Sequence, residues 1–195
     1  MRDVSKESVM RVTRATMLLT VLLAFSATAG AASKDEQRAA IRKGAADTLA
    51  ELHESTPSAE KLVESAAGHA VFSNFGMKIP VAGGGAGKGI VVDNKSKEET
   101  FMKMAELQAG LGFGVKKFRL VWVFGDKADL DRFVNSGWEL GAQTTVAAQY
   151  QGEGDAFEGA VAIKPGVWLY QLTGDGLALE LTARGTRYYR DDELN

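Results

Sequence analysis

The chain has 195 residues, of which 45% are hydrophobic and 25% are charged, and its formal net charge at pH 7 is −2. This composition is typical of one globular domain with a sizeable core, and it excludes a disordered chain. The absence of cysteine excludes disulfide bonds, thiolate metal sites and cysteine nucleophiles. A slightly acidic chain is also a poor nucleic-acid binder, so we expect no nucleic-acid partner.

The first 31 residues have the pattern of a secretory signal peptide. Arg11 and Arg14 precede the apolar run MLLTVLLAFSATA, which leads to the small residues Ala29-Gly30-Ala31. A charged region, a short apolar region and an A-x-A site are the parts of such a peptide, and about 13 apolar residues are too few to span a bilayer. We therefore expect residues 1–31 to be removed by cleavage near Ala31, which makes the protein periplasmic or secreted.

Residues 32–56 are expected to form an N-terminal helical segment. Apolar and small residues recur there at spacings of three and four, which predicts a helix over 34–54 with one buried stripe. The stripe consists of Ile41, Ala45, Thr48, Leu49 and Leu52. A second, short helix is expected next, with Thr56 as its N-cap, Pro57 at its first position and Gly68 at its end.

The stretch VAGGGAGKGIVVD, residues 81–93, raises the question of a phosphate-binding loop. A P-loop reads G-x-x-x-x-G-K-[ST] and opens a helix. Around the pair Gly87-Lys88, the first glycine of that motif is replaced by Ala82, and the residue after the lysine is Gly89. The following Ile90-Val91-Val92 favours a strand, not a helix. We therefore predict a turn between strands that binds no nucleotide.

Beyond Gly68 the apolar residues alternate with period two, which predicts about eight short strands. The clearest segments are 107–114, 116–124, 138–150, 156–164, 166–172 and 176–184. One helix interrupts them, capped by Asp126 and ended by Gly137. Because strand follows strand across short turns, we predict an α+β fold with N-terminal helices and one mid-chain helix. Its large, curved sheet is mainly antiparallel and could close toward a barrel.

Gly110, Gly112 and Gly114 would share one face of the strand predicted at 107–114. Such a bare strip fits a tightly coiled sheet, because nothing projects where the sheet bends most. The alternative is that the strip lets a ligand approach the backbone.

No catalytic or metal-binding constellation is present in the sequence. There is no G-x-S-x-G elbow, and His53 and His69 are expected to be surface or capping residues. Asp126, Asp129 and Asp131 lack the glycine and the glutamate of a calcium loop, so they indicate a helix start. We predict a protein that is not an enzyme and that has no metal or other cofactor.

The chain beyond the first helix, residues 57–195, resembles the SYLF-domain family. The matching stretches are EKLVESAAGHAVFSNFG, VAGGGAGKGIVV, LQAGLGFGVKKFRLVWVFGDKADLDRFVNSGWELGAQTTVAAQ and GLALELTARGTRYYRDDELN. The resemblance implies a lipid-binding domain, directed at acidic phospholipids and aided by an amphipathic N-terminal helix. Some features differ from the family: export would remove actin as a partner, and the helix over 34–54 has four basic side chains against five acidic ones. Packing of that helix on its own sheet is the alternative.

The densest basic cluster of the mature chain is Lys116, Lys117 and Arg119. We predict that acidic phospholipid is engaged there, with help from Lys78 and Lys88, because each basic residue near an anionic surface is attractive. The alternative is that these are edge charges that prevent sheet-to-sheet aggregation. The function expected from the sequence is thus that of a non-enzymatic, exported protein that binds acidic phospholipid or associates with membranes. A periplasmic structural or protein-interaction module, whose partner the sequence does not name, is the alternative.

Overall fold

The computed structural model describes residues 32–78, 82–109, 114–140, 158–174, 176–178 and 185–195. The predicted signal peptide, residues 1–31, therefore lies outside the described residues. Lys34–Asn195 form one compact unit. Its described helices are α2 (Lys34–Ser55), α3 (Pro57–Ser65) and α4 (Lys127–Ser136). None of them combines the length and the hydropathy that crossing a membrane requires.

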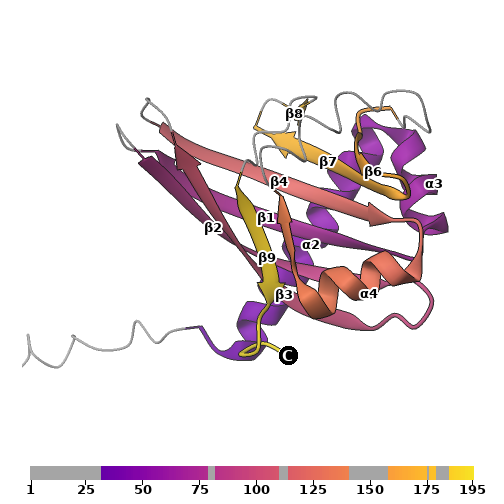
Figure 1. Cartoon of the computed structure of the whole chain (residues 1–195), viewed down its shortest axis with the longest axis horizontal. Coiled ribbons are helices and arrows are strands. Elements are labelled where there is room, and N and C mark those ends of the chain that lie inside the picture. The colour runs from indigo at the N-terminus through magenta and orange to yellow at the C-terminus, as the bar shows by residue number, and fades with distance from the viewer. Residues whose placement is uncertain (1–31, 79–81, 110–113, 141–157, 175, 179–184) are drawn as a thin grey trace, which may run out of the picture. The chain divides into compact units, whose positions relative to one another are not determined.

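The described strands form one antiparallel sheet that curls into a half-barrel (Figure 1). The strands are β1 (Gly68–Lys78), β2 (Ala82–Asp93), β3 (Glu99–Ala109), β4 (Gly114–Phe124), β5 (Trp138–Leu140), β6 (Val161–Lys164), β7 (Val167–Thr173), β8 (Gly176–Ala178) and β9 (Thr186–Arg190). They are ordered β5-β9-β3-β2-β1-β4-β7-β6, and β8 pairs with β7. The predicted α+β fold with a large, curved, antiparallel sheet is confirmed.

Helix α4 covers one face of the sheet, which we call the α4 face (Figure 1). Its central side chain, Phe133, is fully buried among aromatic rings of the sheet. The ring centroids of Phe124, Trp122 and Tyr188 lie 5.0, 5.5 and 5.4 Å from that of Phe133. Edge-to-face and tilted pairs at such distances stabilise a core beyond their buried area. The aromatic alternation of the segment predicted at 116–124 thus builds the main core.

Helices α2 and α3 cover the opposite face, the α2 face (Figure 1). Ala45, Thr48 and Leu52 of α2 are buried, as the spacing predicted. The sheet contributes Val71, Ile90, Phe101, Val121, Val123, Tyr170 and Leu172 to this second core. The helix over 34–54 therefore packs on its own sheet.

The helix ends are only partly as predicted. The carboxylate of Asp126 accepts a hydrogen bond from the amide of Asp129 at 2.9 Å, and Gly137 ends α4 with φ +70°. Thr56, in contrast, makes no side-chain cap, and α3 ends at Ser65, before an extended Ala66. The prediction that Gly68 ends this helix was wrong, because Gly68 opens β1 instead.

The glycine-rich stretch was predicted as a turn, and this was wrong. Residues Ala82–Asp93 form strand β2, which pairs with β1 on one side and β3 on the other. Backbone pairing on both sides offsets the weak strand preference of glycine. At Gly89, an added Cβ would lie 2.3 Å from Cδ1 of Phe72 and 2.4 Å from the carbonyl of Val71. Glycine there lets a neighbouring aromatic ring lie directly over the strand.

Three strand predictions also need correction. Strands β1 to β4 have 11 or 12 residues and are not short. The segment predicted as one strand at 107–114 contains the end of β3 and the first residue of β4, which are separated in the sheet by β1 and β2. Strand β9 was missed. The segments predicted at 138–150, 156–164 and 176–184 contain strands β5, β6 and β8, respectively. The other residues of these three segments lie largely outside the described residues.

Candidate functional site

Two of the predicted basic residues, Arg119 and Lys88, lie in one cross-strand row. Pairing aligns Arg119 of β4 with Ser73, Ser73 with Lys88 of β2, Lys88 with Lys103 of β3, and Lys103 with Tyr189 of β9. We call Arg119, Lys88 and Lys103 the basic row. Lys103 was not predicted, because it stands alone between methionines in the sequence. Only the register of the sheet places it beside Lys88.

Helix α2 lies against the basic row, which fixes the row on the α2 face. The guanidinium of Arg119 forms a bidentate ion pair with Glu51 of α2, in which the Nη2–Oε1 distance is 2.7 Å. The Nζ of Lys88 donates a hydrogen bond to Oε1 of Gln37 at 2.6 Å. These contacts tether α2 to the sheet along the row, so part of the predicted site has a structural role.

Lys103 ties the C-terminal segment to the same face. Its Nζ lies 2.9 Å from the fully buried Asp191 and 3.2 Å from Glu193. The hydrogen bond to Asp191 and, with a smaller effect, the hydrogen bond to Glu193 raise the pKa of Lys103. Asp191 also donates its backbone N–H to the carbonyl of Phe101. Lys103 therefore stays charged and is largely neutralised by these carboxylates.

A second row runs parallel to the basic row, two residues further along each strand. Pairing through Phe75 connects Lys117 of β4 with Ala86 of β2, and then Ala105 of β3 and Arg187 of β9. Lys117, Ala86, Ala105 and Arg187, which we call the outer row, are all exposed. The two alanines are paired on β2 and β3, Phe75 of β1 separates them from Lys117, and Glu139 of β5 pairs with Arg187.

A shallow hollow of about 460 Å³ lies between the two rows on the β1–β2–β3–β9 part of the sheet. Its wall includes Tyr189, whose side chain is 41% exposed. Among the described residues, Tyr189 is the large hydrophobic residue that is exposed to solvent. The lining residues are Ser73, Ala86, Gly87, Lys88, Lys103, Met104 and Tyr189.

Lys78 and Lys116 lie near one another at the level of the backbone. Lys78 ends β1 opposite Gly114, and Lys116 pairs with Gly76, two residues away. Their side chains lie outside what the structure describes, as do residues 110–113 of the predicted glycine strip. The expected adjacency of basic cluster and glycine strip therefore stays a prediction.

His69 and the aspartates considered for calcium binding have structural partners, whereas Nε2 of His53 is buried and has no hydrogen-bond partner among the described residues. His69 shares a hydrogen bond of 3.1 Å with Oδ1 of Asn94, and burial lowers the pKa of His69. Asp129 is buried and paired with Lys164 and Arg132. Over the described ranges, no three histidine, aspartate or glutamate side chains are grouped as metal ligands.

No family model matches the chain. The chain is similar to Beta cell expansion factor A of Aeromonas veronii, with 33% identity over 161 residues. The aligned region covers 82% of this chain and 59% of the relative. The chain therefore spans about three-fifths of the length of the relative that it matches.

Proposed function

We propose that this chain is a non-enzymatic, exported protein that binds the surface of acidic phospholipid membranes through the α2 face of its sheet. The observation that carries the proposal is the register of the sheet. It gathers basic side chains from β2, β3, β4 and β9 into two neighbouring rows around exposed alanines. A gathering of basic side chains on one face attracts an anionic surface.

The charges of the two rows contribute unequally. The ion pairs of Arg119 and Lys103 neutralise much of their charge, so the exposed Lys88 and Arg187 are expected to contribute more of the attraction. Each is expected to contribute about 1 kcal/mol toward an anionic bilayer at moderate salt. The half-exposed ring of Tyr189 suits the interface between headgroups and acyl chains, where tyrosine is enriched.

A resemblance of the sequence supports this proposal. The resemblance of residues 57–195 to the SYLF-domain family points to the same class of ligand. The name of the relative, Beta cell expansion factor A, does not say what that protein binds. That relative is longer than this chain, so we do not assign its whole activity to this chain.

Co-sedimentation with vesicles tests the proposal. We expect the wild type to bind vesicles containing phosphatidylserine at low salt, to bind less at physiological salt, and not to bind phosphatidylcholine alone. Lys88→Glu/Lys117→Glu should weaken binding about tenfold or more. Lys61→Glu/Lys95→Glu is the matched control, with the same change in charge on exposed residues of α3 and the β2–β3 turn. Equal weakening by both pairs would refute a role for the two rows.

A protein-interaction module is the second candidate. The observation that favours it is that Arg119 and Lys103 are already neutralised, while Tyr189 stands exposed beside alanines. An exposed tyrosine on a flat, small-residue surface is a typical anchor of protein interfaces. Absence of vesicle binding by the wild type at low salt would favour this candidate.

Export is tested separately. N-terminal sequencing of the protein isolated from its cells should give a chain beginning near Ala32, outside the cytoplasm. An intact Met1 or Met10 terminus in the cytosol would contradict export, whatever the vesicles show.

A further inference from the structure

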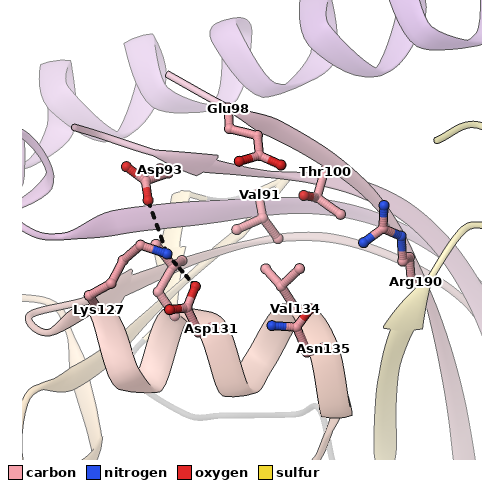
Figure 2. Close-up of a pocket in the computed structure, with 10 residues that line it drawn as sticks. Val91, Asp93, Glu98, Thr100, Lys127, Asp131, Val134, Asn135 and Arg190 are labelled. Atoms are coloured by element: carbon pink, nitrogen blue, oxygen red, sulfur yellow. Dashed lines mark hydrogen bonds and ion pairs between the residues drawn. The ribbon is translucent and has the colours of Figure 1, made fainter. Parts of the chain in front are cut away.

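A cleft of about 200 Å³ opens on the α4 face, between α4 and the hairpin of β2 and β3 (Figure 2). It lies on the opposite side of the sheet from the basic row, and its residues have no part in the proposed function. This volume equals that of roughly six or seven water molecules at about 30 Å³ each, which suits a small molecule well below drug size. The lining residues are Val91, Asp93, Glu98, Thr100, Lys127, Leu130, Asp131, Val134, Asn135 and Arg190.

One end of the cleft is already neutralised and fixed. Lys127 of α4 lies between Asp93 and Asp131, 3.3 Å from the Asp93 carboxylate (Figure 2). The other oxygen of Asp93 accepts the backbone N–H groups of Lys95 and Ser96, both at 2.8 Å. These contacts join the hairpin turn to the start of α4, so this end is a rigid wall and leaves no open ligand group.

The polar groups in the rest of the cleft are uncommitted. Glu98, Asn135 and Arg190 line it, and their side chains form no hydrogen bond or ion pair in the part of the chain that the structure describes. Figure 2 shows the Glu98 carboxylate and the Arg190 guanidinium on two sides of the opening, with Asn135 on the third. A negative and a positive group thus face one cavity without meeting.

The backbone sets this separation. Arg190 of β9 pairs with Met102 of β3, and Met102 stands four residues from Glu98, which corresponds to about 13 Å along a strand. Both side chains line the cleft, on two sides of its opening (Figure 2). Val91, Leu130 and Val134 form its apolar floor. Thr100, between them on β3, adds a hydroxyl.

We propose that this cleft binds a free α-amino acid with a small aliphatic side chain. Arg190 and Asn135 hold the carboxylate, since a guanidinium matches a carboxylate in a bidentate manner. Glu98 receives the ammonium group, and the side chain lies on the apolar floor. A simple anion would face the Glu98 carboxylate, and a simple cation would face Arg190. Only a zwitterion satisfies both groups at once.

Ligand analogues test the proposal on the unmodified protein. Titration of the purified full chain with L-valine, followed by the amide resonances in nuclear magnetic resonance, should shift those of Thr100, Asn135 and Arg190. 3-Methylbutanoate lacks the ammonium group and isobutylamine lacks the carboxylate, and neither is larger than L-valine, so each should bind about ten- to a hundredfold more weakly. Unchanged spectra with L-valine, or equal binding of all three compounds, would overturn the proposal.

Paired variants locate the site. Arg190→Gln and Glu98→Gln should each weaken L-valine binding about tenfold or more. Arg187→Gln, on the same strand but the opposite face, and Glu139→Gln are the exposed controls and should bind like the wild type. Equal binding by Arg190→Gln and Arg187→Gln would refute the assignment. Vesicle binding by Arg190→Gln should be unchanged, so this proposal and the proposed function can fail independently.

Discussion

The long strands β1 to β4 have two unlike halves. In one half, residues on both faces are buried: Val71 and Phe72 are 2% and 0% exposed, and Val121 and Trp122 are both 0% exposed. In the other half the same strands carry exposed Ala86, Lys88, Ala105 and Lys117. The pairing continues through both halves, so hydrogen bonding does not explain the difference.

The two halves differ in the volume of their side chains and in whether helices cover them. The packed half lies between α4 and the pair α2 and α3 (Figure 1), and it provides most of the buried apolar area that stabilises the fold. The small-residue half keeps the strands in place and leaves one face open. The residues that stabilise the fold and the residues of the proposed binding surface thus lie in different halves of the same strands.

The largest expected effect is truncation at the centre of the packed half. Phe133→Ala removes a fully buried ring that contacts five other aromatic side chains. It should lower the free energy of unfolding by about 3–5 kcal/mol. Ala86→Ser in the open half should change it by less than about 0.5 kcal/mol. Urea denaturation measures both, and similar losses would show that the two halves do not differ.

Two glycines of β2 sharpen the comparison within one strand. At Gly89 a Cβ would lie 2.3 Å from Phe72, whereas at Gly84 the nearest atom, the carbonyl oxygen of Glu106, lies at 3.4 Å. Gly89→Ala should therefore cost about 1–3 kcal/mol of unfolding free energy through overpacking. Gly84→Ala should be neutral or slightly stabilising, because alanine restricts the unfolded chain. Thermal denaturation of both variants should separate them, and equal midpoints would contradict the packing difference.

The sequence predicts the packed half better than the open half, for a physical reason. Helix α4 and the buried stripe of α2 follow from caps and apolar spacing, which are local. The stretch around Gly87 was misread because strand pairing on both sides, a non-local property, holds glycines that locally favour a turn. Lys103 and Arg187 were missed for the same reason, since only the register brings them beside Lys88 and Lys117.

The hairpin turn at the packed end gives a pH-dependent prediction. Hydrogen bonds from the backbone of Ser96, then the Lys127 side chain and the backbone of Lys95, lower the pKa of Asp93 from 3.8 to about 2, against the opposing effect of burial. Because the folded pKa is lower than the unfolded one, the stabilisation is complete above about pH 4 and is lost as pH falls toward 2. Asp93→Asn should flatten that acid branch of the stability curve. Asp192→Asn, in the exposed C-terminal turn, is the control and should not.

The smallest expected effect is at Lys88, in the open half. Lys88 is exposed, and its described contact is one hydrogen bond to Gln37. Lys88→Ala should therefore change the free energy of unfolding by less than about 0.5 kcal/mol. We also expect that neither the wild type nor Lys88→Ala binds nucleotide. Strand β2 continues through Lys88 and opens no helix N-terminus that could hold a phosphate. Calorimetric titration of wild type and variant with ATP and GTP measures this. Saturable binding by the wild type that disappears in Lys88→Ala would contradict it, and would make the open half a phosphate site in spite of its strand geometry.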